Sequence, residues 1–242
     1  MLDQRQAAWS DVARRIAHEI KHPLTPIQLA TERLKRRYRK QIEEGENTEL
    51  FDELTSTIVR QVGDLRKMVD EFSSVARLPK PVFRTEDAVD LVRQAVFLQE
   101  VAHNGIDFSV DSSAVDSREI RCDRHQLGQA MTNVLKNAVE AIEARAGEAR
   151  GAYAGQIKVQ IASERDHLVV TIDDNGVGLP ADADRERLTE PYVTTREKGT
   201  GLGLAIVNKI VDEHGGDMAF SASPISGTRV VLRFASDTQI CV

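Results

Sequence analysis

A histidine beside a glutamate is the first group of residues in this chain whose types and spacing could do chemistry. Residues 17–26 read Ala-His-Glu-Ile-Lys-His-Pro-Leu-Thr-Pro within a helical pattern. At about 100° per residue, the apolar side chains gather on one side and His18 points outward, toward solvent. His22 shares that outer face one turn further on, and Glu19 lies about 100° round from His18. A reactive cluster is geometrically available, although a solvated helix face that carries two histidines explains the segment equally well.

Two prolines, Pro23 and Pro26, follow the histidines closely. Pro23 removes a backbone hydrogen bond and its ring crowds the carbonyl of Glu19, so we expect the helix to bend beside the histidines. Bends that cost stability are often tied to function. The pair also fits a plain helix irregularity, and the sequence leaves both interpretations open.

Two carboxamides, Asn133 and Asn137, lie four residues apart on one face of an expected helix. Buried carboxamides at this spacing can coordinate a hard cation through oxygen, as magnesium bound to phosphates requires. Exposed asparagines are the ordinary alternative, so the pair indicates little by itself.

An acidic segment with two glycines follows an apolar strand at residues 173–178 (Asp-Asp-Asn-Gly-Val-Gly). A carboxylate at the bottom of a pocket can accept a hydrogen bond from an amino group such as that of adenine, and glycines let the backbone approach the ligand. A plain turn explains Asp-Asn-Gly about equally well.

Alternating glycines at residues 199–203 (Gly-Thr-Gly-Leu-Gly) lead into a helix. They give unobstructed amides and the positive end of a helix dipole, which suit phosphate oxygens. The spacing is neither the dinucleotide fingerprint nor a P-loop.

Composition excludes several classes of function. The 242 residues carry a formal net charge of −6, which gives no general attraction to nucleic acid or anionic lipid. The basic run at residues 33–40 continues a helical pattern and is most simply a solvated face. Two distant cysteines, Cys122 and Cys241, suit a reducing cytosol. We find no apolar run of the roughly 18 residues that a membrane span needs and no signal peptide, so we expect a cytoplasmic polypeptide that is part of a longer protein.

The elements that must position these groups fall into two parts. Residues 3–42 and 49–77 predict two long helices, joined by the polar stretch 43–48. Their apolar seams cannot be covered by a lone antiparallel hairpin, so we expect two copies to form a four-helix bundle, and hence a homodimer. Packing of the hairpin against the rest of its own chain is the alternative.

Beyond Leu78-Pro79-Lys80-Pro81, which interrupts the helix, the pattern turns mixed. We expect a helix to about Ala102, capped by Thr85 or Asp87, and a second from Arg124 to Arg145, capped by Asp123. A third runs from Gly203 to His214. Expected strands cover 106–110, 120–122, 157–163, 167–173, 218–221 and 229–234. The fold class is therefore α+β, with a helix layer on a mixed sheet.

The order and separation of Asn-x-x-x-Asn, Asp-x-Gly-x-Gly and Gly-x-Gly-x-Gly-Leu resemble the ATP-binding domain shared by gyrase, Hsp90, histidine kinases and MutL. With His18-Glu19 on a dimerising hairpin upstream, residues 7–235 resemble the catalytic core of a bacterial sensor histidine kinase. The contexts of His18 and Asn137, together with Glu71-Phe72-Ser73-Ser74, are most similar to the nitrogen-regulation, NtrY-like group.

The resemblance implies a domain for each segment. Residues 1–78 would be the dimerisation and histidine phosphotransfer hairpin, 79–84 a hinge linker, 85–236 an α/β-sandwich ATP-binding domain of the Bergerat type, and 237–242 a tail. The implied reaction is autophosphorylation of His18 by ATP, followed by transfer to an aspartate in the receiver domain of a response regulator.

The resemblance also implies roles for single residues. His18 would be the phosphoacceptor, with Glu19 as its proton acceptor. Asn137 would hold Mg²⁺ with Asn133 nearby, and Asp174 would read the adenine amino group, with Thr228 in support. Residues 179–198 would form a lid. The remaining nucleotide-binding candidates are Gly176, Gly178, Thr194, Arg196, Lys198, Gly199, Gly201, Leu202 and Gly203.

One position departs from the family pattern. Most relatives carry asparagine or threonine where this chain has His22, a residue associated with orienting water for dephosphorylation of the regulator. We therefore expect autophosphorylation to be retained and phosphatase activity to be altered. Imidazole also binds water, and its charge varies near neutral pH.

Two other functions compete with the kinase. One is an ATP-hydrolysing conformational machine of the same superfamily, whose members generally carry a water-activating glutamate where this chain has Asn133. The other is a scaffold that binds ATP without transferring phosphate, which is disfavoured because no core motif is missing.

Overall fold

The structure, a computed structural model, describes residues 2–39, 42, 46–76, 79–116, 119–148, 153–179 and 202–236. The chain divides into two compact units, Met1–Pro79 and Lys80–Val242. The first is a helical hairpin, and the second is an α/β unit that combines helices with two sheets.

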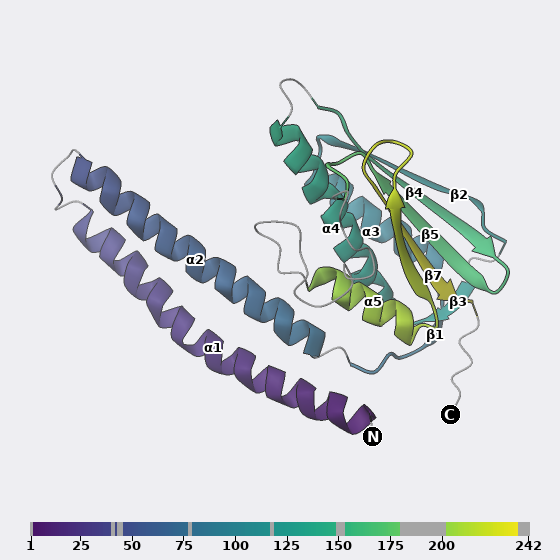
Figure 1. Cartoon of the computed structure of the whole chain (residues 1–242), viewed down its shortest axis with the longest axis horizontal. Coiled ribbons are helices and arrows are strands. Elements are labelled where there is room, and N and C mark those ends of the chain that lie inside the picture. Colours follow the sequence, from purple (N-terminus) through teal and green to yellow (C-terminus); the bar gives the residue numbers. More distant parts are fainter. Residues whose placement is uncertain are drawn as a thin grey trace. The chain divides into compact units, whose positions relative to one another are not determined.

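The hairpin consists of α1 (Leu2–Tyr38) and α2 (Glu46–Ala76), which lie side by side (Figure 1). The two predicted helices are confirmed, but their bounds were wrong at the connection, since α1 ends at Tyr38 rather than 42 and α2 begins at Glu46. Ile42 donates its amide to the carbonyl of Tyr38 over 3.2 Å. Polar sequence with no apolar anchor does not mark such an end sharply.

The contact between α1 and α2 follows a seven-residue period. Its buried side chains are Ala17, Leu24 and Thr31 on α1, and Thr48, Thr55, Val62 and Val69 on α2. Seven residues make almost two helical turns, so the period keeps one seam facing the partner helix. The hydroxyls of Thr31 and Thr55 are satisfied locally, because each donates to the carbonyl four residues earlier.

A second apolar stripe on the same hairpin faces outward. It consists of Ile20, Ile27 and Leu34 on α1, with Leu54, Ile58 and Leu65 on α2, and these side chains are 41–55% exposed. On α1 this stripe also has a seven-residue period. The apolar side predicted for α1 is therefore split between a half that packs on α2 and a half that is open in the single chain.

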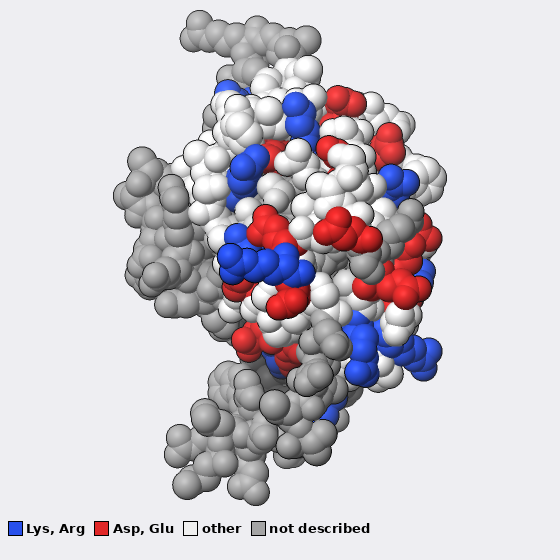
Figure 2. All heavy atoms as spheres, turned by 90° about the vertical axis from the view of Figure 1, so that its right-hand side faces the viewer, with Lys and Arg blue, Asp and Glu red and all other residues white. Residues whose placement is uncertain are grey.

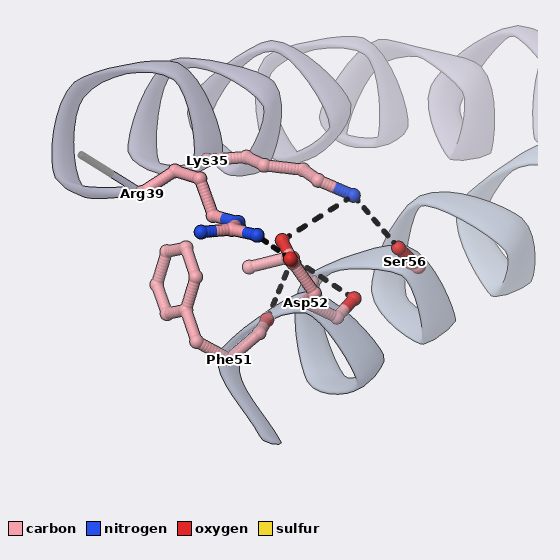
Figure 3. A network of polar contacts seen from close by, with 6 residues as sticks. Lys35, Arg39, Phe51, Asp52 and Ser56 are labelled. Carbon is pink, nitrogen blue, oxygen red and sulfur yellow. Dashed lines mark hydrogen bonds and ion pairs between the residues drawn. The ribbon is translucent and has the colours of Figure 1, made fainter. Parts of the chain in front are cut away.

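Polar contacts join the two helices near their connection (Figure 3). Asp52 of α2 forms ion pairs with Arg39, just after α1, and with Lys35 of α1, whose ammonium also donates to Ser56 over 2.9 Å. These charges are partly exposed, so each pair contributes little to stability, on the order of 0–1 kcal/mol. Their main effect is to fix which residues face each other at this end.

The α/β unit is built on a five-stranded sheet in the order β2-β4-β5-β7-β6. Its strands are β2 (Ile106–Ala114), β4 (Gly155–Glu164), β5 (His167–Asp174), β6 (Asp217–Ala222) and β7 (Thr228–Ala235). Strands β2 and β4 are parallel and the other pairs antiparallel, which confirms the mixed sheet. Helices α3 (Ala88–Ala102), α4 (Arg124–Glu148) and α5 (Gly203–Glu213) form a layer on one face (Figure 1).

The core of this unit lies between the sheet and the helix layer. Fully buried side chains come from α4 (Leu127, Met131, Leu135), β4 (Ile157, Ile161), β5 (Leu168, Ile172), α5 (Ile210) and β7 (Leu232, Phe234). Alternation along β7, where every second residue is buried, gives the sheet one covered face. The predicted α+β class, with a hairpin followed by an α/β sandwich, is confirmed. The four-helix bundle requires a second chain and stays a prediction.

One strand was missed, and one predicted strand is confirmed but lies in a separate sheet. Residues Arg84–Asp87 form β1, which pairs with β3 (Glu119–Cys122) in a separate two-stranded sheet. The expected strand at 120–122 is thus real but does not join the main sheet. Residues 84–87 (Arg-Thr-Glu-Asp) lack apolar alternation, so periodicity could not reveal a strand that is held mainly by its ladder. Of the two caps proposed for α3, Asp87 is correct, because its carboxylate accepts from the amide of Asp90.

Charge is mixed on the face of the molecule shown in Figure 2. Lys and Arg side chains lie among Asp and Glu side chains across its described atoms. Such interspersed charges do not add up to a field of one sign.

Candidate functional site

One face of α4 runs between two of the predicted nucleotide-binding segments, the acidic segment 173–178 and the glycine segment 199–203. Near its middle, Asn133 donates its side-chain amide to the carbonyl of Gly203, the first residue of α5, over 3.4 Å. Two turns later, the carbonyl of Ala141 accepts from the amide of Val177, in the loop after β5, over 3.1 Å. Asn137 lies midway on the same broad face and is half-buried. Eight helical residues span about 12 Å, so this face connects the start of α5 to the acidic loop.

The two adjacent aspartates at the end of β5 have different partners. Asp173 is buried and forms a bidentate ion pair with Arg229, at 2.9 Å to Nε and 2.7 Å to Nη2, and also accepts from the hydroxyl of Ser223. Hydrogen bonding to Asp173 raises the pKa of Arg229. Because Asp173 and Arg229 face each other across β5 and β7, the pair fastens these two strands. The Asp173 carboxylate is therefore engaged in contacts that stabilise the fold.

Asp174, also buried, turns its Oδ1 toward backbone amides. This oxygen accepts from Gly176 over 2.8 Å and from Thr228 over 3.2 Å. The carboxylate therefore joins the loop after β5 to the start of β7. The two amides in turn fix the position of the carboxylate, which is itself a hydrogen-bond acceptor. The structure brings three predicted nucleotide residues, Asp174, Gly176 and Thr228, into one cluster.

Close packing explains the glycines of this cluster. A Cβ at Gly176 would lie 2.5 Å from the carbonyl carbon of Ala141 on α4, and a Cβ at Gly227 would collide with the backbone and Oδ1 of Asp174. Gly178 has φ +76°, a conformation that L-residues with side chains rarely adopt. A larger residue at Gly176 would push the loop away from α4, and one at Gly227 would push the backbone away from Asp174.

The start of α5 presents a helix N-terminus at the other end of this face. Leu202, the N-cap, is buried, and its apolar side chain cannot accept from the amides of the first turn. Those amides and the positive end of the helix dipole suit an anionic ligand. Leu202 and Gly203 are described, whereas the other predicted phosphate-side residues, Thr194, Arg196, Lys198, Gly199 and Gly201, lie outside the described residues.

The predicted phosphoacceptor segment belongs to the other unit. His18 lies within α1, and its side chain is outside the described part of the chain. Glu19 and His22 are exposed, while Ala17 is buried against α2. Both prolines lie inside α1, which curves along its length in Figure 1, in keeping with the bend that Pro23 predicts.

A buried histidine connects α5 to the beginning of α4. His214, the C-cap of α5, accepts at Nε2 from the amide of Asp123 over 3.0 Å and donates from Nδ1 to the carbonyl of Ile210 over 2.7 Å. Burial lowers the pKa of His214, so the ring is neutral. The carboxylate of Asp123 caps α4, as predicted, by accepting from the amides of His125 and Gln126, and it also accepts from Val82.

The sequence reasoning missed two arginines beside the cluster. Arg229 partners Asp173, and Arg145 of α4 donates to loop carbonyls near Asp174. Arg145 was detectable in principle, because it continues the four-residue spacing of Asn133, Asn137 and Ala141. Arg229 gave no signal, since its partner is chosen by strand register.

Two family models match the chain in succession. Residues 8–81 match the His Kinase A (phospho-acceptor) domain, and residues 122–238 match the histidine kinase-, DNA gyrase B- and HSP90-like ATPase. Together they cover both units in the order expected of a kinase core. The chain belongs to the sensor histidine kinases.

Similar proteins agree with this family. The nitrogen regulation protein NtrY of Azorhizobium caulinodans is 54% identical over 221 residues, which make up 91% of this chain and 28% of that protein. Sporulation kinase E of Bacillus subtilis is 30% identical over 220 residues, 90% of this chain and 27% of that kinase. This histidine kinase chain thus spans under a third of the length of either curated relative.

A solved structure shares the fold over nearly the whole chain. The crystal structure of full-length ShkA in complex with AMPPNP has a TM-score of 0.66 at 22% identity, and covers 93% of this chain and 46% of ShkA. Among the helices that the structure of this kinase chain describes, none combines the length and apolarity needed to cross a membrane.

Proposed function

We propose that this chain is a catalytic core that transfers the γ-phosphoryl group of ATP to His18, and from there to an aspartate of a response regulator. One observation carries the proposal. The α4 face bearing Asn133 and Asn137 leads from the N-terminus of α5 to the Asp174 cluster, over a distance that a nucleoside triphosphate can span.

ATP would bind with its base at the Asp174 cluster and its phosphates toward α5. The Asp174 carboxylate is an acceptor, so it selects a donor such as the 6-amino group of adenine, and Thr228 contributes to the same wall. Gly176 and Gly178 let the loop approach the base. Leu202 and Gly203 open the helix that faces the phosphates, and Gly199 and Gly201 precede them in the same glycine motif. The proposed lid carries Thr194, Arg196 and Lys198.

Magnesium fits the donor set of this face. Mg²⁺ prefers oxygen ligands and takes few from the protein when phosphates supply the rest. Asn137 would supply one carboxamide oxygen, with Asn133 a turn away near the start of α5. The ion, when bound, neutralises charge on the transferring phosphate. What the chain itself supplies is the position of the nucleotide.

The transfer step needs a nucleophile and a place for its proton. An imidazole nitrogen of His18 attacks the γ-phosphorus, the bond from that phosphorus to the β,γ-bridging oxygen breaks, and ADP leaves. The imidazole proton passes to Glu19, one residue along α1, whose carboxylate is exposed and able to release it to water. Because His18 and the nucleotide belong to different units, we propose that residues 79–84 act as a hinge.

We also propose that the hairpin dimerises. The stripe containing Ile20, Ile27, Leu54, Ile58 and Leu65 is exposed in the single chain, and it has the seven-residue period of a helix seam on α1. A second copy would bury it in a four-helix bundle. The intact protein would then present two phosphoacceptor histidines to receiver domains, in the cytosol, where ATP is available.

His22 bears on hydrolytic dephosphorylation of the regulator. It is exposed and one turn from His18, so its imidazole can bind water near the phosphorylated regulator. We propose that autophosphorylation is retained while phosphatase activity differs from that of relatives with asparagine or threonine there. Unchanged regulator dephosphorylation in a His22→Asn variant would contradict this.

Incubation with γ-labelled ATP and Mg²⁺ tests the proposed function. We expect acid-labile, alkali-stable label on the wild-type chain, no label on His18→Gln, and strongly reduced labelling on Glu19→Gln. Release of free phosphate without labelled protein would favour the conformational machine, and nucleotide binding with neither product would favour the scaffold. Asn133→Glu is a useful companion, since it restores the carboxylate that the hydrolysing relatives carry.

A further inference from the structure

Arg145 lies where three segments of the α/β unit converge. Its Nη1 donates to the carbonyls of Asn175 at 2.9 Å, Gly176 at 3.0 Å and Ser226 at 2.9 Å, and to the Ser226 hydroxyl at 2.9 Å. One guanidinium on α4 therefore contacts both the loop after β5 and the turn between β6 and β7. The proposed catalytic residues do not include it.

These contacts flank Asp174 on both sides. Asn175 and Gly176 follow Asp174 directly, while Ser226 precedes Gly227 and Thr228, the residues that pack on Asp174 or bond to it. Arg145 thus holds the two backbone segments whose amides fix the Asp174 carboxylate. If these segments separated, the carboxylate would lose the partners that set its direction.

Neighbouring side chains hold the same loop. The Tyr153 hydroxyl also donates to the carbonyl of Asn175, and the Arg145 guanidinium lies 5.5 Å from the centre of the Tyr153 ring. The side chain of Asn175 bonds to the backbone of Ala154 and Gln156, at 2.9 and 2.8 Å. The loop is therefore tied to β4 as well as to α4.

Electrostatics explains why a cation is needed here. Three carbonyl oxygens converge within 3.0 Å of one nitrogen, and without a cation their negative ends would repel each other. Ser226 also holds φ +75°, a strained conformation for a residue with a side chain. Charge-assisted hydrogen bonds to its carbonyl and hydroxyl compensate for that strain.

We propose that Arg145 is a positioning residue for adenine recognition, which keeps the Asp174 carboxylate aimed at the base. This inference rests on the proposed ATP site. Guanine presents a carbonyl where adenine presents an amino group, so the aim of Asp174 affects selection of the base more than binding of the phosphates. Arg145 touches neither the phosphates nor the reacting atoms in this scheme.

The test is calorimetric titration of the full chain with AMPPNP and with GMPPNP, both with Mg²⁺. For Arg145→Ala we expect AMPPNP to bind about tenfold more weakly and GMPPNP to change less than about threefold, so the preference for adenine falls. Arg145→Lys should restore part of the preference, because an ammonium can still donate to these carbonyls. Arg124→Ala is the matched control, since Arg124 lies on the same helix but pairs with Glu86 and Gln94.

The outcomes separate this inference from the proposed function. A wild-type chain that binds neither nucleotide would refute the ATP site itself. A wild-type chain that prefers AMPPNP, with an equal preference in Arg145→Ala, would refute the positioning role and leave the ATP site standing. A parallel loss for both nucleotides would also refute it, because a purely structural role does not change the ratio. If Arg145→Ala fails to fold, Arg145→Lys and Tyr153→Phe are judged by the same ratio.

Discussion

The hairpin and the α/β unit differ in which of their apolar and polar side chains are buried. Among the hairpin side chains that the structure describes, the buried seam contains three threonines among seven residues, while isoleucines and leucines of the outer stripe remain about half exposed. In the α/β unit, large apolar side chains from both layers are fully buried, and buried aspartates have specific partners. The α/β unit completes its core within one chain, although Phe97, Leu98 and Val101 of α3 are exposed. The hairpin differs in that its exposed apolar side chains form a stripe with a seven-residue period on α1, which the proposed second copy would cover.

A charged residue in the outer stripe should have the largest effect, because it would oppose burial of the stripe in a dimer. Burial of a Leu or Ile side chain is worth about 1.5–3 kcal/mol, and a symmetric interface contains each substitution twice. We expect Ile27→Glu or Leu65→Glu to weaken the dimer about a thousandfold, measured by light scattering over a dilution series. AMPPNP binding by the α/β unit should be unaffected.

Leu98→Glu is the matched control for that experiment. Leu98 on α3 is 64% exposed, yet it belongs to the unit that covers its own core. We expect this variant to dimerise like the wild type. Dissociation of Leu98→Glu, or persistence of the dimer in both hairpin variants, would contradict the proposal that the hairpin stripe rather than the α/β unit forms the dimer interface.

Within the α/β unit, removing the charge of Asp174 and of Asp173 should have different effects. Asp174→Asn keeps an oxygen that can accept from Gly176 and Thr228 but loses the charge, so we expect AMPPNP affinity to fall about a hundredfold and stability by about 1 kcal/mol.

Asp173→Asn breaks the pair with Arg229, which is about a third exposed, so we expect the free energy of unfolding to fall by about 2 kcal/mol and AMPPNP affinity to change little. Urea unfolding and calorimetry measure both, and the reverse assignment of effects would refute the distinct roles.

A smaller effect should appear in the pH dependence of stability. Burial lowers the pKa of His214 below the ordinary value for histidine, which is about 6.5, so the unfolded chain binds this proton more readily than the folded chain. The stabilisation is complete above about pH 6.5 and is lost as pH falls, by at most about 1.4 kcal/mol per pH unit. Urea midpoints at pH 7.5 and 5.5 test this. His214→Gln should be less stable overall but show a flatter dependence, and an equal slope in both would exclude His214 as the cause.

The smallest expected effect is a thiol that does not react. Burial, with Glu86 and Asp123 nearby, raises the pKa of Cys122 to about 12. In a Cys241→Ser background we expect no alkylation by iodoacetamide at pH 8 until the α/β unit is unfolded in urea. Rapid alkylation of the native protein, followed by mass spectrometry, would show that this core opens more readily than its burial indicates.

Local sequence predicted the elements well where apolar periodicity or a cap marked them. The helices α4 and α5 and the hairpin β4–β5 follow the predicted ranges within a few residues, and Asp123 caps α4. It failed at β1, where four mostly polar residues form a strand only because β3 pairs with them. It also placed the end of α1 too late, because charged helix-forming residues continue past Tyr38.

Local sequence is enough to show the order of the motifs, the helical period that groups Asn133 with Asn137, and the family to which they belong. The tertiary fold is needed to show that Asp173 rather than Asp174 pairs with Arg229, and that Arg145 joins two loops separated by about fifty residues of chain. The physical reason is that spacing along one helix or strand is fixed by local geometry, whereas partners across strands and loops are chosen by register and packing.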